Sequence, residues 1–179
     1  MNKTLIILAH DDMDNSVLNS RFKKELENQE NIIYRDLNAL YPNYDIDVQK
    51  EQELLKDVSK VVFQFPMYWY SLPSALKNWI DKVFSYGYSY IIDENGAFTP
   101  LALKDKKFQV IATMGAKEES FVGEDRLSVK ECLNSCFYTA KMLGMKELKP
   151  LFFYGAAYDK LSEEILNKYS NIIKKELIG

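Results

Sequence analysis

Short apolar runs alternate along the chain with segments that are apolar on one face only. The apolar runs predict strands at 4–9, 32–35, 60–65, 108–113 and 149–154. Between and after them, apolar residues spaced three or four apart predict helices at about 17–28, 47–57, 74–86, 127–143 and 162–177. Strands that alternate with amphipathic helices predict a parallel sheet covered on both faces.

Five such units in 179 residues predict the fold class α/β, as a single domain spanning residues 1–179. They fit a flavodoxin-like three-layer sandwich around a five-stranded parallel sheet of order 2-1-3-4-5. Segment 88–100 fits no helix, and we expect it to form a loop or a small hairpin that turns at Asn95-Gly96.

The overall charge and the absence of long apolar runs restrict the classes of partner. The net charge of −3 argues against nucleic acid or an anionic membrane as a partner. The apolar run Leu5–Ala9 is too short for the core of a signal peptide or for a membrane span. We therefore expect a cytoplasmic protein.

The two cysteines, Cys132 and Cys136, lie four residues apart and could share one helix face. A redox or metal pair would fit that spacing. However, their neighbours Val129, Leu133 and Phe137 complete an apolar helical stripe with them. Unpaired cysteine behaves as a small buried hydrophobe, so the pattern favours core packing.

Three loops carry the unusual residues, and each follows a predicted strand. Strand one ends at His10, strand three ends at Pro66 before Met67-Tyr68-Trp69-Tyr70, and strand four ends at Thr113-Met114-Gly115-Ala116. In a sheet of order 2-1-3-4-5, ligands bind at the carboxyl ends of the strands, near the reversal between the first and third. The three loops are neighbours there, so the sequence predicts one site.

The positions of glycine and histidine exclude several kinds of site. No glycine precedes Gly87, so strand one leads into neither a P-loop nor a G-x-G-x-x-G turn. His10 is the only histidine, which rules out an H-E-x-x-H zinc site and allows a Ser-His-Asp triad only if it is built on His10. We predict no metal site, and hydrolase chemistry finds little support.

The first helix offers a way to hold a phosphate without a glycine-rich loop. Its free N–H groups could bind an anion, with Ser16 and Asn19 facing the same way and His10 entering from the strand end. Equally, Ser16 could simply cap the helix. The nearby aspartates disfavour an anion unless they turn to solvent; they are Asp11, Asp12 and Asp14.

The aromatic run that follows Pro66 indicates a flat ligand. Consecutive residues of an extended chain point to opposite sides, so three adjacent rings cannot all enter one core. Edge-of-core packing or a subunit contact would also explain exposed rings. Together with the other two loops, a planar aromatic ligand is the better explanation, since ring-on-ring contact adds about 0.5–1.5 kcal/mol beyond burial. Gly115 would let backbone approach that ligand.

With these three loops, the sequence resembles the flavodoxin-like NAD(P)H:quinone oxidoreductases. It is especially similar to the short bacterial subgroup that includes ancillary reductases of potassium-efflux systems and general stress proteins. The matching text runs through most of residues 4–121, and its most specific block is FPMYWYS-x-P-x-x-LKNWID.

The resemblance implies a bound flavin and assigns the three loops to its parts. The phosphate positions are His10, Ser16, Val17, Leu18 and Asn19. The segment along the isoalloxazine ring is Pro66, Met67, Tyr68, Trp69 and Tyr70. The turn at the polar edge of the ring is Thr113, Met114, Gly115 and Ala116. FMN is the expected cofactor, and FAD is the alternative.

The resemblance also implies the reaction and the partners. NADH or NADPH would pass hydride through the flavin to a quinone or similar planar acceptor by a ping-pong mechanism, in a homodimer whose partner helps close each pocket. The alternative is a regulatory protein rather than an enzyme. A flavin-binding regulatory subunit of a potassium-efflux transporter would keep the flavin pocket and have only weak or incidental catalytic turnover. A one-electron carrier like flavodoxin is a third reading.

The sequence departs from the family pattern at several positions. Asp11 replaces the usual proline, and Ala116 replaces the second glycine of T-T-G-G, which would strain Ala116 if that position needs a positive φ. Phe121 occupies the place of a tyrosine that assists reduction in larger members, and no second histidine exists. We therefore assign no catalytic side chain.

Overall fold

A parallel sheet forms the centre of the computed structural model, which describes residues 3–157 and 161–178. Its strands run in the order β2-β1-β3-β6, and β7 and β8 both pair with β6 at the edge. The bounds are β1 Lys3–Leu8, β2 Ile32–Asp36, β3 Val58–Pro66, β6 Lys107–Thr113, β7 Lys146–Glu147 and β8 Leu151–Phe153. The predicted flavodoxin-like order is therefore confirmed.

The fifth strand is split, which the apolar pattern did not predict. β7 pairs with the start of β6 and β8 with its end, where Leu151 lies opposite Ile111. Between the two pieces stands Pro150, which has no N–H to donate to a ladder. The predicted strand at 149–154 is thus shortened to Leu151–Phe153.

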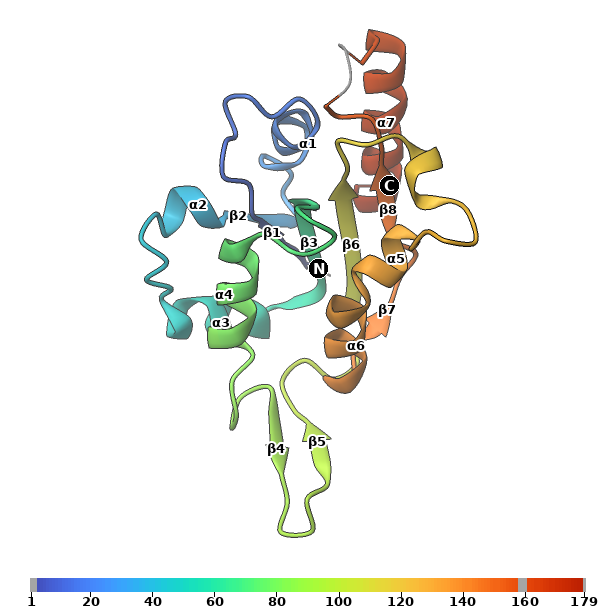
Figure 1. Cartoon of the computed structure of the whole chain (residues 1–179). Helices are drawn as coiled ribbons and strands as arrows, with labels where there is room; N and C mark the ends of the chain where they lie inside the picture. Colours follow the sequence, from blue (N-terminus) through green and yellow to red (C-terminus); the bar gives the residue numbers. More distant parts are fainter. Residues whose placement is uncertain (1–2, 158–160, 179) are drawn as a thin grey trace.

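Helices cover both faces of the sheet (Figure 1). One face packs against α1 Leu18–Leu26 and α7 Glu163–Leu177. The other face packs against α3 Val48–Lys56, α4 Ser74–Val83, α5 Val129–Cys132 and α6 Asn134–Met142. Strand alternation divides the core accordingly, since Val61 and Phe63 of β3 face α4 whereas Val62 faces α1. The short helices α2 Leu37–Leu40 and η1 Glu118–Phe121 were not predicted.

The predicted helix at 127–143 is wrong in one respect, because it breaks at Leu133. That residue has φ −95° and ψ 15°, outside the helical region, and separates α5 from α6. Leu133 itself is buried, as are Val129 before it and Phe137 after it, so the apolar period continues through the break and hides it. Core packing is confirmed for Cys136, whose burial raises the pKa of its thiol to about 12. Cys132 is partly exposed, and both thiols are free.

The segment 88–100 forms the predicted small hairpin and projects from the sandwich (Figure 1). Its antiparallel strands are β4 Tyr90–Ile92 and β5 Phe98–Pro100. Gly96 has a φ of +78°, and the Asp93 carboxylate accepts from the N–H groups of Asn95 and Ala97 at 2.9 Å. The Tyr90 and Phe98 rings stack at 4.6 Å.

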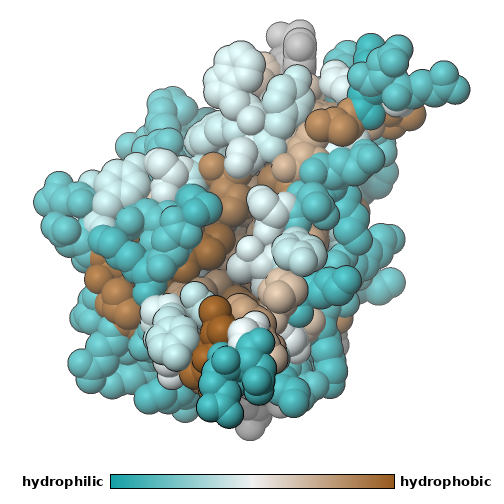
Figure 2. Space-filling model, turned by 60° about the horizontal axis from the view of Figure 1, so that its bottom comes forward, coloured by the Kyte–Doolittle hydropathy of each residue, from teal (hydrophilic) through white to brown (hydrophobic). Residues whose placement is uncertain are grey.

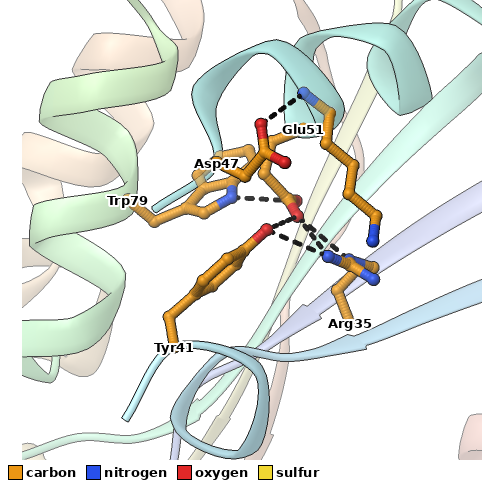
Figure 3. Close-up of polar contacts among 6 residues, drawn as sticks. Arg35, Tyr41, Asp47, Glu51 and Trp79 are labelled. Carbon is orange, nitrogen blue, oxygen red and sulfur yellow. Dashed lines mark hydrogen bonds and ion pairs between the residues drawn. The ribbon is translucent and has the colours of Figure 1, made fainter. Parts of the chain in front are cut away.

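A buried carboxylate joins four elements on the α3 and α4 side of the sheet (Figure 3). Glu51 is fully buried and accepts from the Arg35 guanidinium, from the Tyr41 hydroxyl at 2.7 Å and from the Trp79 indole N–H at 3.1 Å. Arg35 also donates to Tyr41 at 3.1 Å. Because both Glu51 oxygens, the Tyr41 hydroxyl and the Trp79 N–H have partners within the protein, we assign the cluster to stability rather than to ligand binding.

Candidate functional site

Two adjoining cavities lie where β1, β3 and β6 end. The larger cavity, of about 300 Å³, and the smaller cavity, of about 170 Å³, share Met67 and Gly115 in their walls. The predicted residues on the larger cavity are His10, Ser16, Val17, Leu18, Asn19, Pro66, Met67, Tyr68, Thr113 and Gly115. Those on the smaller cavity are Met67, Trp69, Tyr70, Met114, Gly115 and Ala116. The fold thus brings all three predicted loops to one place.

Three wall residues of the larger cavity were not predicted, and Phe121 of the smaller cavity was not assigned to the site. Asn15 lies before α1, and Ala156 and Ala157 follow β8. A signal for the alanines did exist, since β8 is the neighbour of β6 and its carboxyl end opens at the same edge.

The amino end of α1 faces the larger cavity without a side-chain cap. Its cap position is Val17, which has no oxygen to offer, and the Ser16 hydroxyl makes no capping bond. The alternative that Ser16 caps this helix is therefore wrong. The first N–H groups of α1 remain available to a bound acceptor, and the partial positive charge of the helix end favours an anion there.

The aspartates before α1 turn to solvent, as an anion site would require. Asp11, Asp12 and Asp14 are all exposed. The Asp11 carboxylate accepts from the Asn38 amide at 2.9 Å, and Asp12 accepts from the Asn15 side chain at 2.7 Å. Among the described residues that line the two cavities, none is an aspartate or a glutamate.

His10 is held as a neutral hydrogen-bond donor. Its Nδ1 accepts the Asp12 N–H at 3.1 Å, so the neutral ring carries its proton on Nε2. Burial lowers the pKa of His10, and the charges of Asp11, Asp12 and Asp36 only partly offset this. His10 also meets the Tyr68 ring edge-on at 6.5 Å.

This environment predicts how His10 responds to pH. Because its folded pKa lies below the usual 6.5, the unfolded chain binds a proton first. The contribution of the neutral His10 ring to stability is complete above pH 6.5, and it is lost as the pH falls through the pKa of the folded state. We expect the ring signal of this single histidine to titrate below 6.5 in the cofactor-free protein, as followed by NMR.

An Asp11→Asn variant provides the control for that titration. The Asp11 charge raises the pKa of His10, so removing it should lower the pKa further. A His10 pKa at or above 6.5 in the cofactor-free protein would contradict the buried, neutral ring.

The aromatic run forms a tight turn with unusual backbone angles. Trp69 and Tyr70 have φ values of +46° and +62°, and the N–H groups of Tyr68 and Ser71 each donate to the other residue's carbonyl, at 3.1 and 3.0 Å. The Trp69 side chain is 92% exposed, which confirms that one ring faces outward. The cause differs from the predicted alternation of an extended chain, because the turn itself directs Trp69 and Tyr70 outward. Positive φ in such bulky residues is a strained conformation that is typical of functional sites.

The turn after β6 offers backbone donors to the cavities. The N–H of Met114 donates to Phe153, whereas those of Gly115 and Ala116 have no acceptor in the described part of the chain. Ala116 does not adopt a positive φ, so the strain expected there does not arise. Gly115 is required by packing, because a Cβ there would lie 2.9 Å from the Ala157 Cβ.

The side chains of two wall residues contact other residues of the protein, which limits how they can contact a ligand. The Asn19 amide is 1% exposed and bonds Thr113 and Gln64, so it contributes to the wall rather than reaching freely into the cavity. Phe121 packs against Tyr154 at 5.9 Å and closes the smaller cavity without a titratable group.

Neither a metal-binding cluster nor a membrane-spanning helix occurs among the residues that the structure describes. They contain no group of three or more metal-binding side chains. They also contain no helix with the length and apolar character that a membrane crossing needs.

Comparison with curated proteins shows relatives along nearly the whole chain. General stress protein 14 of Bacillus subtilis is 38% identical over 158 residues, which is 87% of each chain. A protein of the same organism named as an uncharacterised NAD(P)H oxidoreductase, YrkL, is 37% identical over 90% of each chain. The glutathione-regulated potassium-efflux system ancillary protein KefG of Cronobacter sakazakii is 35% identical over 90% of this chain and 85% of its own.

Solved structures share the fold over the same extent. A protein named as a thermophilic tryptophan halogenase from Streptomycin violaceusniger is 34% identical with a TM-score of 0.86, over 98% of each chain. General stress protein 14 from Treponema denticola, solved in complex with FMN, is 30% identical with a TM-score of 0.83, over 98% of this chain and 96% of its own. A family model described as a flavodoxin-like fold matches residues 2–177. The chain therefore belongs to this flavodoxin-like family.

Proposed function

We propose that this protein is an FMN-dependent NAD(P)H:quinone oxidoreductase. The observation that carries the proposal is the pair of joined cavities, one beside an uncapped helix end and one beside exposed aromatic rings. An oxidoreductase name among the relatives and an FMN complex among the related structures support it.

The larger cavity fits the phosphate end of a flavin. The uncapped N–H groups of α1, the Ser16 hydroxyl and the Nε2–H of His10 are all donors, and donors are what a phosphate oxygen requires. The outward-turned aspartates leave that end without opposing charge.

The smaller cavity fits the flat, apolar ring with a polar edge. Met67, Trp69 and Tyr70 supply apolar and aromatic surface, and the free N–H groups of Gly115 and Ala116 supply donors. FMN needs no more than these two cavities. FAD would need room for an adenine beyond the phosphate end, so we place FMN first.

The chemistry belongs to the cofactor, and the protein orients the reactants. When bound, a flavin accepts hydride from NADH or NADPH and gives two electrons to a quinone-like acceptor. The chain offers one exposed aromatic rim, at Trp69 and Tyr70, for both substrates. They must use it in turn, which gives ping-pong kinetics. Phe121 carries no proton, so we place no side-chain acid or base here.

A homodimer would complete this site. Leu72, Ile80, Phe84, Tyr90 and Cys136 line a groove of about 290 Å³ between α4, α6 and the hairpin. Figure 2 shows a hydrophobic hollow on this side of the molecule, between hydrophilic borders. A second copy would bury this groove together with the exposed Tyr86, whose ring meets Tyr90 edge-on at 5.9 Å. Light scattering measures this directly, and a monomer at working concentration would contradict it.

A regulatory subunit of a potassium-efflux transporter is the second candidate, because KefG is a relative at 35% identity. Such a subunit would keep the flavin site and act by docking to its transporter. In either role we infer a cytoplasmic location, which suits the two free thiols.

Steady-state turnover tests the proposed activity. Purified protein reconstituted with FMN should oxidise NADH or NADPH with a benzoquinone, and double-reciprocal plots at several quinone concentrations should be parallel. The protein without FMN is the control. Bound FMN without turnover would favour the regulatory subunit, and failure to bind FMN would contradict both.

A further inference from the structure

A chain of polar side chains crosses the apolar core beneath α1 and ends at the larger cavity. The Tyr34 hydroxyl donates to Gln64 Oε1 at 2.7 Å, and Gln64 Nε2 donates to Asn19 Oδ1 at 3.1 Å. Asn19 Nδ2 then donates to Thr113 Oγ1 at 2.9 Å. The four residues come from β2, β3, α1 and β6, and we call them the polar relay.

The polar relay lies where packing alone would favour apolar side chains. Gln64, Asn19 and Thr113 are 0%, 1% and 3% exposed. The neighbours of Gln64 along β3, Phe63 and Phe65, point to the opposite face. A buried amide must find partners for its donors and its acceptor, so each member of the relay depends on the next.

The direction of the relay is fixed by a group that can only accept. Gln64 Nε2 also lies 3.4 Å from the main-chain oxygen of Asn19. An oxygen facing that carbonyl would be repelled, so the Gln64 amide must turn its nitrogen toward Asn19. The Asn19 oxygen then faces Gln64, and the Asn19 nitrogen faces Thr113.

This direction leaves the Thr113 hydroxyl as a donor. Its oxygen accepts from Asn19, so its proton must go elsewhere, and no acceptor for it occurs within residues 3–157 and 161–178. Thr113 lines the larger cavity, beside Ser16 and His10. We propose that the polar relay fixes Thr113 as a hydrogen-bond donor to an acceptor atom of the bound cofactor, with Gln64 and Asn19 as its positioning residues.

The inference rests on the proposed flavin site and predicts coupling between distant residues. Thr113→Val removes the donor and should weaken FMN binding about tenfold, the usual effect of one hydrogen bond. Gln64→Leu frees Asn19 to turn its oxygen toward Thr113, whose proton is then taken by Asn19. Gln64→Leu should therefore weaken FMN binding as much as Thr113→Val does, although Gln64 lines neither cavity. The double variant should bind no more weakly than either single variant.

Two control variants separate this role from packing. Val62→Ala, on the same strand and face, lowers stability but leaves the relay intact, so its FMN dissociation constant should stay within about twofold of wild type. Tyr34→Phe should weaken binding by only about threefold or less, because the Asn19 carbonyl still orients Gln64.

Titration of the cofactor-free variants with FMN, followed by flavin fluorescence, provides the measurement. If Gln64→Leu does not fold, Gln64→Met removes the amide with an unbranched side chain. Two results would contradict the proposed role of the relay. One is a loss of FMN affinity of about a hundredfold in the double variant of Thr113→Val and Gln64→Leu, which would mean that the two effects are additive. The other is an unchanged FMN dissociation constant in Gln64→Leu. Those results require a wild-type protein that binds FMN, so they are distinct from failure of the proposed function.

Discussion

Replacing Glu51 by alanine is expected to lower the free energy of unfolding by about 3–5 kcal/mol, the usual effect of removing one partner of a buried ion pair. The change leaves the Arg35 guanidinium, whose side chain is 12% exposed, without its carboxylate. It also leaves the Tyr41 hydroxyl and the Trp79 indole N–H without their acceptor. Urea unfolding followed by tryptophan fluorescence measures the loss.

Glu53→Ala is the matched control, because Glu53 is exposed on the same helix, α3. It should cost less than about 0.5 kcal/mol. Adding Arg35→Met to Glu51→Ala should recover part of the loss, since no unpaired buried charge then remains. Equal losses in Glu51→Ala and Glu53→Ala would mean that the buried cluster of Figure 3 does not stabilise the fold.

The double variant Trp69→Asn and Tyr70→Gly should stabilise the cofactor-free protein and weaken cofactor binding. Both residues have positive φ in the native turn, where bulky side chains are strained and Asn-Gly is preferred. After allowance for the greater freedom of glycine in the unfolded chain, we expect a net gain of about 1 kcal/mol. Loss of the aromatic rim should weaken FMN binding about tenfold. Thermal unfolding and FMN titration measure the two effects.

Asp105→Gly is the control for the backbone effect. Asp105 also has a positive φ, of +66°, but lines neither cavity. Asp105→Gly should relieve backbone strain in the same way, and it should leave FMN binding unchanged. A destabilised double variant would show that the turn is not strained. FMN binding as tight as in wild type would show that the two rings have no role in holding the cofactor.

The fold was predictable because its signals are local. A strand buried on both faces is a short, continuous apolar run, and a helix buries every third or fourth residue, so β3 and α4 appear directly in the sequence. The break at Leu133 and the splitting of the last strand at Pro150 were missed. The apolar period runs unbroken through Leu133, and Pro150 stands inside an apolar run that otherwise reads as one strand, so neither interruption changes the pattern of burial.

The location of the site was predictable for a topological reason. Residues that follow neighbouring parallel strands must meet at one edge, so His10, Pro66 and Thr113 could be placed together before any geometry was known. The assignment of particular atoms of a cofactor to these residues remains a prediction. The wall at Ala157 was not predicted, because it follows β8, a fourth strand, in a run of small residues at 155–157 that has no distinctive chemistry.

By itself, the sequence determined the order of the elements, the two apolar faces of the sheet and the loops that form the site. Only the tertiary structure decided the turn at Trp69, the uncapped end of α1 and the direction of the polar relay. The physical reason is distance along the chain. Burial patterns arise between near neighbours, whereas Asn19 finds its partner Thr113 across 94 positions, so its hydrogen bond exists only once the sheet has brought the two together.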